Sequence, residues 1–169
     1  MRQKVRRQQP TLAVPGGGIT RQLLIHPAAA NLDDFALRVS VADVDSDGPF
    51  SRFDGIDRTL TLLEGGGLQL QRDGAPLATL QADSPLLHFA GEWPISSQRL
   101  AGKVRDFNIM TRRSQCHHRA ERLSLDGSLT LASAQRALAN SDASEVQLLG
   151  DARVTRKAAT PNEALLQQA

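Results

Sequence analysis

Alternating apolar and polar residues predict that most of this chain is β-structure. From Phe35 to Ala42 the sequence reads FALRVSVA, in which Phe, Leu and Val alternate with small or polar residues. A period of two over eight residues is typical of a half-buried strand. The run from Val104 to Arg112, VRDFNIMTR, predicts another strand. One of its faces carries Arg105, Phe107 and Ile109, and the other carries Val104, Asp106, Asn108 and Met110.

Glycine and proline separate the predicted strands. Asp73-Gly74 supplies the positive φ that a type I′ hairpin turn requires, and Asp47-Gly48-Pro49 predicts a sharp reversal. Pro15 to Gly18 indicates a tight turn or a close backbone approach, and Gly65 to Gly67 a bulge or a tight corner. Between these breaks the sequence predicts strands at Ile19–Ile25, Arg58–Leu63, Leu68–Gln71, Leu77–Leu80, Leu86–Phe89 and Gln98–Leu100.

The last third of the chain is less regular. Leu123–Leu131 predicts a hairpin with Asp126-Gly127 at its tip, and Glu145–Leu149 and Ala152–Thr155 predict strands. Ala132–Ser144 is small and polar, which indicates a loop with room for a short helix at Ala134–Ala139. Thr160–Glu163 has the form of a capping box, so a short C-terminal helix is expected. Short strands with glycine turns and almost no helical periodicity predict an all-β sandwich or barrel, and periodicity alone does not choose between them.

The amino-acid composition argues against some classes of binding partner, nucleic acids in particular. The chain has 169 residues, enough for one domain or two small fused β-units, with a formal net charge of +2. It has one Trp, five Phe and no Tyr, which argues against a stacking platform for single-stranded nucleic acid. Basic residues gather near the N-terminus, where residues 1–10 are expected to form a solvated basic tail. Direct nucleic-acid binding is therefore not expected.

The cysteine content and the apolar runs of the sequence also indicate the cellular compartment and the possible assembly. Cys116 is the single cysteine, so an intramolecular disulfide is impossible. There is no apolar run long enough to span a bilayer, and the charged N-terminus is not followed by the apolar region of a secretory signal. We expect a cytoplasmic protein that does not enter a membrane. Exposed sheet edges make a homodimer one candidate assembly, although no residue specifies it.

Three sequence blocks carry a resemblance to a known family. GGGIT from Gly16 to Thr20, DGPFSRFDGIDRTL from Asp47 to Leu60 with LLEGGGL after it, and GKVRDFNIM from Gly102 to Met110 resemble the HutD/Ves family in order and spacing. FAGEWP from Phe89 to Pro94 is similar to a linking block of that family. The chain departs from the pattern where the family has Trp and Asn before the glycines, here Ala13 and Pro15. It departs again where the family has Glu after the Thr, here Gln22.

The resemblance implies a fold and a role. It implies a double-stranded β-helix of the cupin or jelly-roll type, with two cupin-like units in one compact chain. We expect this domain over residues 11–156, best matched over 11–113 and closed by a second unit over 114–156, with 157–169 as a tail or short helix. The implied function is a metal-free, non-enzymatic protein that binds a small carboxylate, such as N-formylglutamate or a related histidine-degradation intermediate. It would modulate histidine utilisation.

The matched blocks contain groups suited to a carboxylate ligand. A guanidinium offers a planar fork of donors that fits a carboxylate bidentately, and Arg52, Arg58 and Arg105 are available. Each of these arginines could instead form a structural ion pair, and Asp106 could orient an arginine rather than touch the ligand. Glycine amides can form an anion-binding nest. The predicted ligand-binding residues are Gly17, Gly18, Thr20, Ser51, Arg52, Arg58, Arg105, Asp106 and Asn108.

Other chemistries have weaker support. The four histidines include no HxH pair, and adjacent His117 and His118 point to opposite sides of an extended segment, so no metal or cofactor is expected. No GxSxG elbow and no P-loop lysine is present, and we predict no catalytic residue. The alternatives are a Ves-like stress-response protein, a cupin enzyme acting on a small molecule, or a relative that has lost its ligand and acts through protein contacts.

Overall fold

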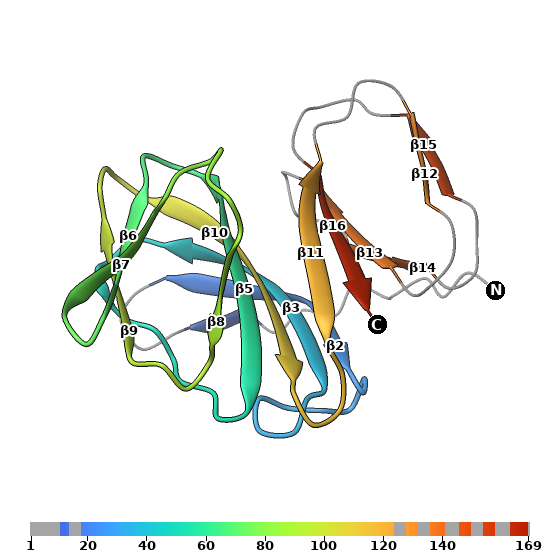
Figure 1. Cartoon of the computed structure of the whole chain (residues 1–169), viewed down its shortest axis with the longest axis horizontal. Coiled ribbons are helices and arrows are strands. Elements are labelled where there is room, and N and C mark those ends of the chain that lie inside the picture. The colour runs from blue at the N-terminus through green and yellow to red at the C-terminus, as the bar shows by residue number, and fades with distance from the viewer. Residues whose placement is uncertain are drawn as a thin grey trace. The chain divides into compact units, whose positions relative to one another are not determined.

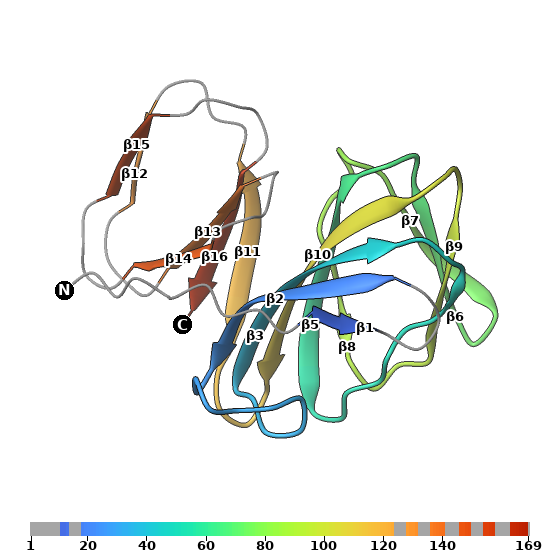
Figure 2. The same ribbon diagram turned by 180° about the vertical axis from the view of Figure 1, so that it is seen from behind.

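The computed structural model describes residues 18–123 continuously, and outside this range it describes only strands (Figures 1 and 2). Every element in the described part of the chain is a β-strand, and all of the pairings are antiparallel. No helix of the length and hydrophobicity needed to cross a membrane occurs among the described residues. The prediction of an all-β chain is confirmed.

The chain divides after Gln115 into two compact units, one spanning Gln8–Gln115 and the other containing Cys116–Ala169. The first unit holds two sheets. In spatial order, the six-stranded sheet consists of β1 (Thr11–Ala13), β2 (Ile19–His26), β3 (Leu37–Val44), β10 (Val104–Arg112), β5 (Ile56–Glu64) and β8 (Leu87–Ala90). The four-stranded sheet consists of β4 (Gly48–Pro49), β9 (Ile95–Arg99), β6 (Leu68–Arg72) and β7 (Ala75–Leu80).

The second unit also holds two sheets. One consists, in order, of β11 (His118–Leu123), β16 (Glu163–Gln168), β13 (Arg136–Asn140) and β14 (Val146–Leu149). The other pairs β12 (Ser128–Leu131) with β15 (Val154–Lys157). Residues 1–10, which the sequence predicts to be a basic tail, lie outside the described part.

Three local predictions in the second unit are wrong. Leu123–Leu131 is not a hairpin, because β11 pairs with β16 whereas β12 pairs with β15; its predicted tip lies outside the described residues. Arg136–Asn140 is a strand where a loop or helix was expected, and Glu163–Gln168 is a strand where a tail or helix was expected. Both segments contain good helix formers, but each strand hydrogen-bonds to neighbours on both sides, and this pairing outweighs local propensity.

The core of the first unit lies between its two sheets. Leu60 and Leu62 of β5 meet Leu68 and Leu70 of β6 in a buried cluster that also contains Phe89. The triple glycine between β5 and β6 forms the tight corner that the sequence predicted, with Gly65 at a φ of +109°. This corner turns one leucine-rich strand directly into the next, so that both strands contribute to the same core.

Strand β10 is central to the larger sheet, since it pairs with β3 on one side and β5 on the other. Its predicted bounds and alternation are confirmed. The register aligns three rows of side chains on one face of β3, β10 and β5: Ala42, Asp106 and Leu62; Ser40, Asn108 and Leu60; Arg38, Met110 and Arg58. Strand β2 extends the first two rows with Thr20 and Gln22.

The expectation of a half-buried β3 is wrong. Val39 and Val41 are fully buried on one face, but Arg38 and Ser40 on the other face are only 5% and 3% exposed. The polar face of this strand is buried because it lines a cavity. Alternate residues of β3 therefore face either the hydrophobic interior or the cavity, and neither face is open to solvent.

Candidate functional site

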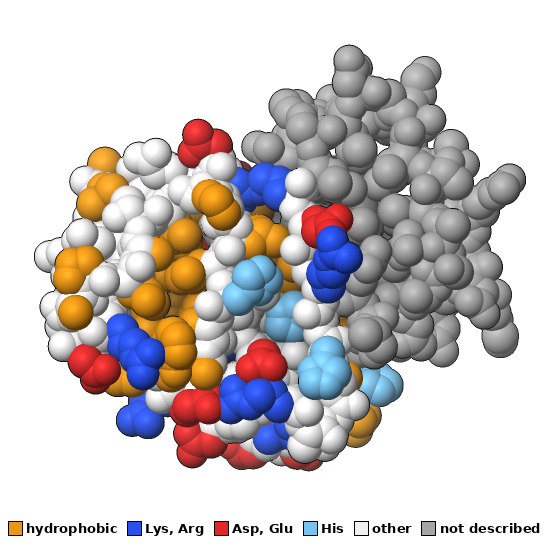
Figure 3. Space-filling model, in the orientation of Figure 1, with side chains coloured by type: hydrophobic (Ala, Val, Ile, Leu, Met, Phe, Trp, Pro, Cys, Tyr) orange, Lys and Arg blue, Asp and Glu red, His pale blue; other side chains and the backbone are white. Residues whose placement is uncertain are grey.

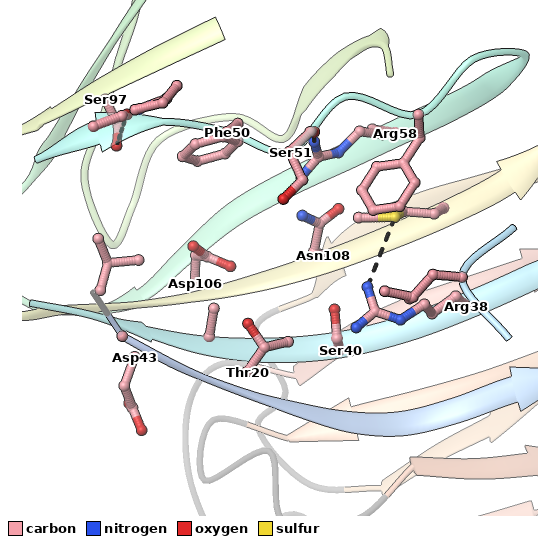
Figure 4. A pocket seen from close by; sticks show the side chains of 18 of the residues that line it. Thr20, Arg38, Ser40, Asp43, Phe50, Ser51, Arg58, Ser97, Asp106 and Asn108 are labelled. Atoms are coloured by element: carbon pink, nitrogen blue, oxygen red, sulfur yellow. Dashed lines mark hydrogen bonds between the residues drawn. The ribbon is translucent and has the colours of Figure 1, made fainter. Parts of the chain in front are cut away.

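A cavity of about 220 Å³ lies over the polar face of β2, β3, β10 and β5 (Figure 4). It is somewhat smaller than the roughly 300–1,000 Å³ of pockets for drug-sized ligands, which suits a small metabolite. Most residues of the aligned rows form its floor, whereas Leu60 and Leu62 of the same rows pack in the core. The segment before β5 together with β4 and β9 supplies further lining residues, among them Phe50, Ser51 and Ser97. The sheet register fixes the backbone positions from which the polar groups of this floor project.

Arg58 is the most confined cation of the cavity. Its residue is 5% exposed, and its Nη1 donates a hydrogen bond to the backbone oxygen of Ser51 at 3.1 Å. The guanidinium carbon lies 5.3, 5.8 and 5.0 Å from the ring centroids of Phe50, Phe53 and Phe89, within the range of cation–π attraction. The buried Nε has no hydrogen-bond partner. A donor of this kind is available to an acceptor on a ligand.

Burial also changes the charge balance at Arg58. Desolvation lowers the pKa of its guanidinium to about 10, opposed by attraction to Asp106 and assisted by repulsion from Arg38. The group is still protonated at neutral pH. A buried, charged guanidinium with an unused donor is the strongest anion-attracting group in the cavity.

Asp106 and Asn108 face the same space from β10. The Oδ1 atoms of both residues are buried without a hydrogen-bond partner. Burial raises the pKa of Asp106 to about 7, because desolvation outweighs the attraction of Arg58 and the charge of Asp43 adds repulsion. Unsatisfied buried acceptors are unfavourable, so a ligand that brings an N–H or O–H group would be stabilised here.

The structure brings most of the predicted site residues together. The cavity is lined by Gly18, Thr20, Ser51, Arg58, Asp106 and Asn108. Gly17 lies outside the described residues.

Arg52 and Arg105 do not line the cavity. Arg52 is exposed and donates through Nε to the backbone oxygen of Glu92 at 3.0 Å. Arg105 lies on the opposite face of β10 from Asp106, where it donates to Asp43 Oδ1 at 2.6 Å and to Glu64 at 3.2 Å. Strand alternation therefore places Arg105 in a surface ion-pair network rather than among the cavity groups.

Sequence reasoning missed two charged residues that line the cavity, Asp43 and Arg38. Arg38 is buried, and its Nε donates to Gln22 Oε1 at 3.1 Å while its Nη1 approaches Met110 Sδ at 4.0 Å. Burial lowers the pKa of Arg38 from its ordinary value. The sequence does show Arg38 as the one charged residue in the alternating run from Phe35 to Ala42. A strand whose polar face is exposed to solvent has the same pattern, so the pattern does not reveal a buried cation.

The surface differs from the cavity in its charge pattern. On the face shown in Figure 3, acidic and basic side chains lie next to one another rather than gathering by sign. Ion pairs of the described residues include Arg113 with both Asp57 and Glu92, and Arg99 with Asp47 at 2.9 Å. Within the described part of the chain, no three His, Cys, Asp or Glu side chains gather into a group that could hold a metal ion.

Comparison with known proteins gives a consistent family. The HutD family model matches residues 15–168. An uncharacterised 21.2 kDa protein in the hutC 3′ region of Pseudomonas putida is 38% identical over 95 residues, which cover 56% of this chain and 49% of that protein. Protein Ves from Escherichia fergusonii is 37% identical over 113 residues, or 66% of this chain and 58% of that protein. The chain thus spans about half the length of the curated relatives it matches.

Two solved structures that match over nearly the whole chain are 25% identical to it. HutD from Pseudomonas fluorescens SBW25, solved in a formate condition, is 25% identical with a TM-score of 0.75, and the match covers 95% of this chain and 93% of that one. A conserved protein of unknown function from Pseudomonas aeruginosa PAO1 is also 25% identical, with a TM-score of 0.77 and coverage of 95% and 94%.

Proposed function

Because this chain belongs to the HutD family, as the match over residues 15–168 shows, we propose that it binds a small carboxylate and modulates histidine utilisation. The two similar proteins named for hutC and HutD support the link to that pathway. The proposal includes the fold that the sequence blocks imply, a double-stranded β-helix with two cupin-like units. In this reading the protein is a sensor rather than a catalyst.

The observation that carries the proposal is the buried Nε donor of Arg58, which lines the cavity and has no hydrogen-bond partner. A carboxylate placed against this guanidinium gains a charge-assisted hydrogen bond in surroundings of low dielectric constant, where such bonds are strong. The unsatisfied acceptors of Asp106 and Asn108 lie on the same floor and suit an N–H on the ligand. An amino or amide dicarboxylate such as N-formylglutamate carries both kinds of group.

A thermal-shift titration tests the proposal directly. The purified protein is melted with increasing N-formylglutamate, glutamate, formate, urocanate or histidine. A ligand that binds only the folded state stabilises it by about 2.7 kcal/mol at a hundredfold excess over Kd. We expect a saturable shift that is largest for N-formylglutamate.

Two variants separate the cavity from the surface. Arg58→Met removes the buried guanidinium and is expected to abolish the shift, whereas Arg105→Ala removes a guanidinium from the opposite sheet face and is expected to preserve it. An undiminished shift in Arg58→Met would refute the proposed site. Cooperative melting of the wild-type protein without a shift for any compound would refute the proposed function.

One observation favours a second candidate function, an enzyme that transfers a proton. A carboxyl with a pKa of about 7 in a cavity has the properties of a general base at neutral pH. Asp106 would take a proton from one atom of a small acid bound at Arg58 and return it to another atom of the same molecule. Turnover of such an acid by the wild-type protein that is lost in Asp106→Asn, while binding persists, would establish this function. If the wild-type protein binds the acid but does not convert it, the proposed sensor function is retained.

A further inference from the structure

The carboxyl group of Asp106 is buried in the cavity without a salt bridge. The residue is 3% exposed, and its Oδ1 has no hydrogen-bond partner. The two arginines of the cavity donate elsewhere. Arg58 donates to the backbone oxygen of Ser51, and Arg38 donates to the amide oxygen of Gln22. Within the described part of the chain no ion pair includes Asp106. A buried carboxylate without a paired cation is costly, so the fold favours the neutral, protonated acid.

Few other charges face Asp106. Among the described residues, the cavity is lined by four with ionisable side chains: Arg38 and Asp43 on β3, Arg58 on β5, and Asp106 itself on β10. Strands β4 and β9 and the segment before β5 add no other ionisable group to the lining. The carboxylate of Asp43 pairs with Arg105 at 2.6 Å and with Arg21 at 3.6 Å. Asp106 is therefore the lining acid that is free to exchange a proton.

A carboxylate at Arg58 changes the electrostatic surroundings of Asp106. The two residues face the same cavity from neighbouring strands, and Asn108 occupies the row of the sheet between them (Figure 4). The negative charge of the ligand offsets the attraction that Arg58 exerts on an ionised Asp106, and the bulk of the ligand displaces water. Both effects disfavour the ionised acid. Once protonated, Asp106 can donate an O–H to the ligand.

We propose that carboxylate binding in this cavity is coupled to the uptake of one proton by Asp106, so that the protein binds its ligand more weakly as the pH rises above neutrality. The inference rests on the proposed function and adds its regulation by pH. Ligand and proton each favour the binding of the other, because coupling between two sites is reciprocal. A protonated Asp106 in the complex cannot accept a proton, so this coupling argues against the second candidate function.

Calorimetric titration with N-formylglutamate in paired buffers counts the protons. The carboxylates of this probe stay ionised above about pH 6 and its amide does not titrate, so the probe itself neither takes up nor releases a proton. Two buffers with different enthalpies of ionisation are used at each pH, HEPES and Tris at pH 8, and MES and Bis-Tris at pH 6. The difference between the two measured binding enthalpies gives the number of protons taken up for each ligand bound.

The pKa of about 7 for Asp106 sets the expected result for wild-type protein. At pH 8 the acid is mostly ionised before the ligand binds, so we expect uptake of about 0.5 to 1 proton per ligand. At pH 6 the acid is already protonated, and we expect uptake below about 0.2 proton. Because proton uptake equals the slope of log affinity against pH, affinity should fall by about threefold to tenfold per pH unit above pH 7.

Two variants identify the group that takes up the proton. Asp106→Asn keeps the shape of the protonated acid but cannot bind the proton. It is expected to take up no proton at pH 8 and to bind with the same affinity at pH 6 and pH 8. Asp43→Asn is the matched control, because it removes the other carboxylate of the lining, and it should still take up a proton at pH 8. Uptake that persists in Asp106→Asn, or that is lost in Asp43→Asn alone, would overturn the inference.

The outcome also distinguishes this inference from the proposed function. If wild-type protein binds N-formylglutamate at pH 8 without taking up a proton, the carboxylate site stands and the coupling is wrong, whatever the variants do. If N-formylglutamate does not bind even at pH 6, the proposed function and the coupling are both wrong. If proton uptake occurs at pH 8 and is lost in Asp106→Asn, both are supported.

Discussion

Replacing Asp106 by asparagine should make the protein more stable at neutral pH, by an amount that depends on pH. The structure buries this carboxyl on β10 and raises its pKa from 3.8 to about 7. Asparagine has nearly the shape of the protonated acid and never ionises. The difference between the two proteins therefore reports the free energy that the fold loses when Asp106 becomes charged.

The sign follows from proton linkage. Below about pH 4 the carboxyl is protonated in both the folded and the unfolded chain, so it adds no pH-dependent term. Between about pH 4 and 7 the unfolded chain releases this proton and the folded chain keeps it, so the free energy of unfolding falls by about 1.4 kcal/mol per pH unit. Above pH 7 both states are ionised and the loss is constant, on the order of 4 kcal/mol.

Urea denaturation of wild-type and Asp106→Asn protein from pH 4 to pH 8 measures this difference. We expect the two free energies of unfolding to coincide near pH 4 and to diverge steadily up to pH 7, with the variant more stable. Arg58 does not confound the comparison, since its pKa of about 10 keeps it charged throughout this range. Parallel curves would refute the raised pKa. A variant that is less stable at pH 8 would also refute the reasoning and would mean that Arg58 holds Asp106 ionised in a stabilising pair.

Two further predictions concern the scaffold of the cavity. Leu60→Ala, at a fully buried position of β5, should lower the free energy of unfolding by about 2–5 kcal/mol in urea denaturation, and a loss below about 1 kcal/mol would contradict the proposed core. Gly65→Ala should destabilise more than Gly74→Ala. Both glycines have positive φ, but a Cβ at Gly65 would lie 2.6 Å from the backbone oxygen of Lys103, whereas one at Gly74 would meet nothing within 4 Å. Left-handed strain alone costs about 1–2 kcal/mol, so equal losses measured for the two variants would show that the corner after β5 relaxes.

The sequence predicted the strands of the first unit better than those of the second. In VRDFNIMTR, period two gave both the bounds of β10 and the separation of Arg105 from Asp106 and Asn108. In Arg136–Asn140 and Glu163–Gln168 the residues favour helix locally, and the strand state depends in part on the distant pairings of β13 with β16 and of β16 with β11. Local patterns do not encode such partners.

In the candidate site, too, the sequence predicted some residues correctly and not others. Arg58, Asp106 and Asn108 lie on strands whose alternation fixes their direction, and the structure places them around one cavity. Arg52 lies in a turn-rich segment, where no period determines which way a side chain points. Arg38 was missed for a different reason, because a polar strand face next to a cavity has the same sequence pattern as a polar face next to water.

The central position of β10 has a consequence for synthesis of the protein. Strands β3 and β5 are translated well before β10, yet each of them pairs with β10 and not with the other. Until Val104–Arg112 leaves the ribosome, the nascent chain therefore holds two incomplete sheet segments with open edges, which are prone to wrong pairing. The same strand delivers Asp106 and Asn108, so closure of the sheet and completion of the cavity are a single late event. A nascent chain shorter than the first unit has neither.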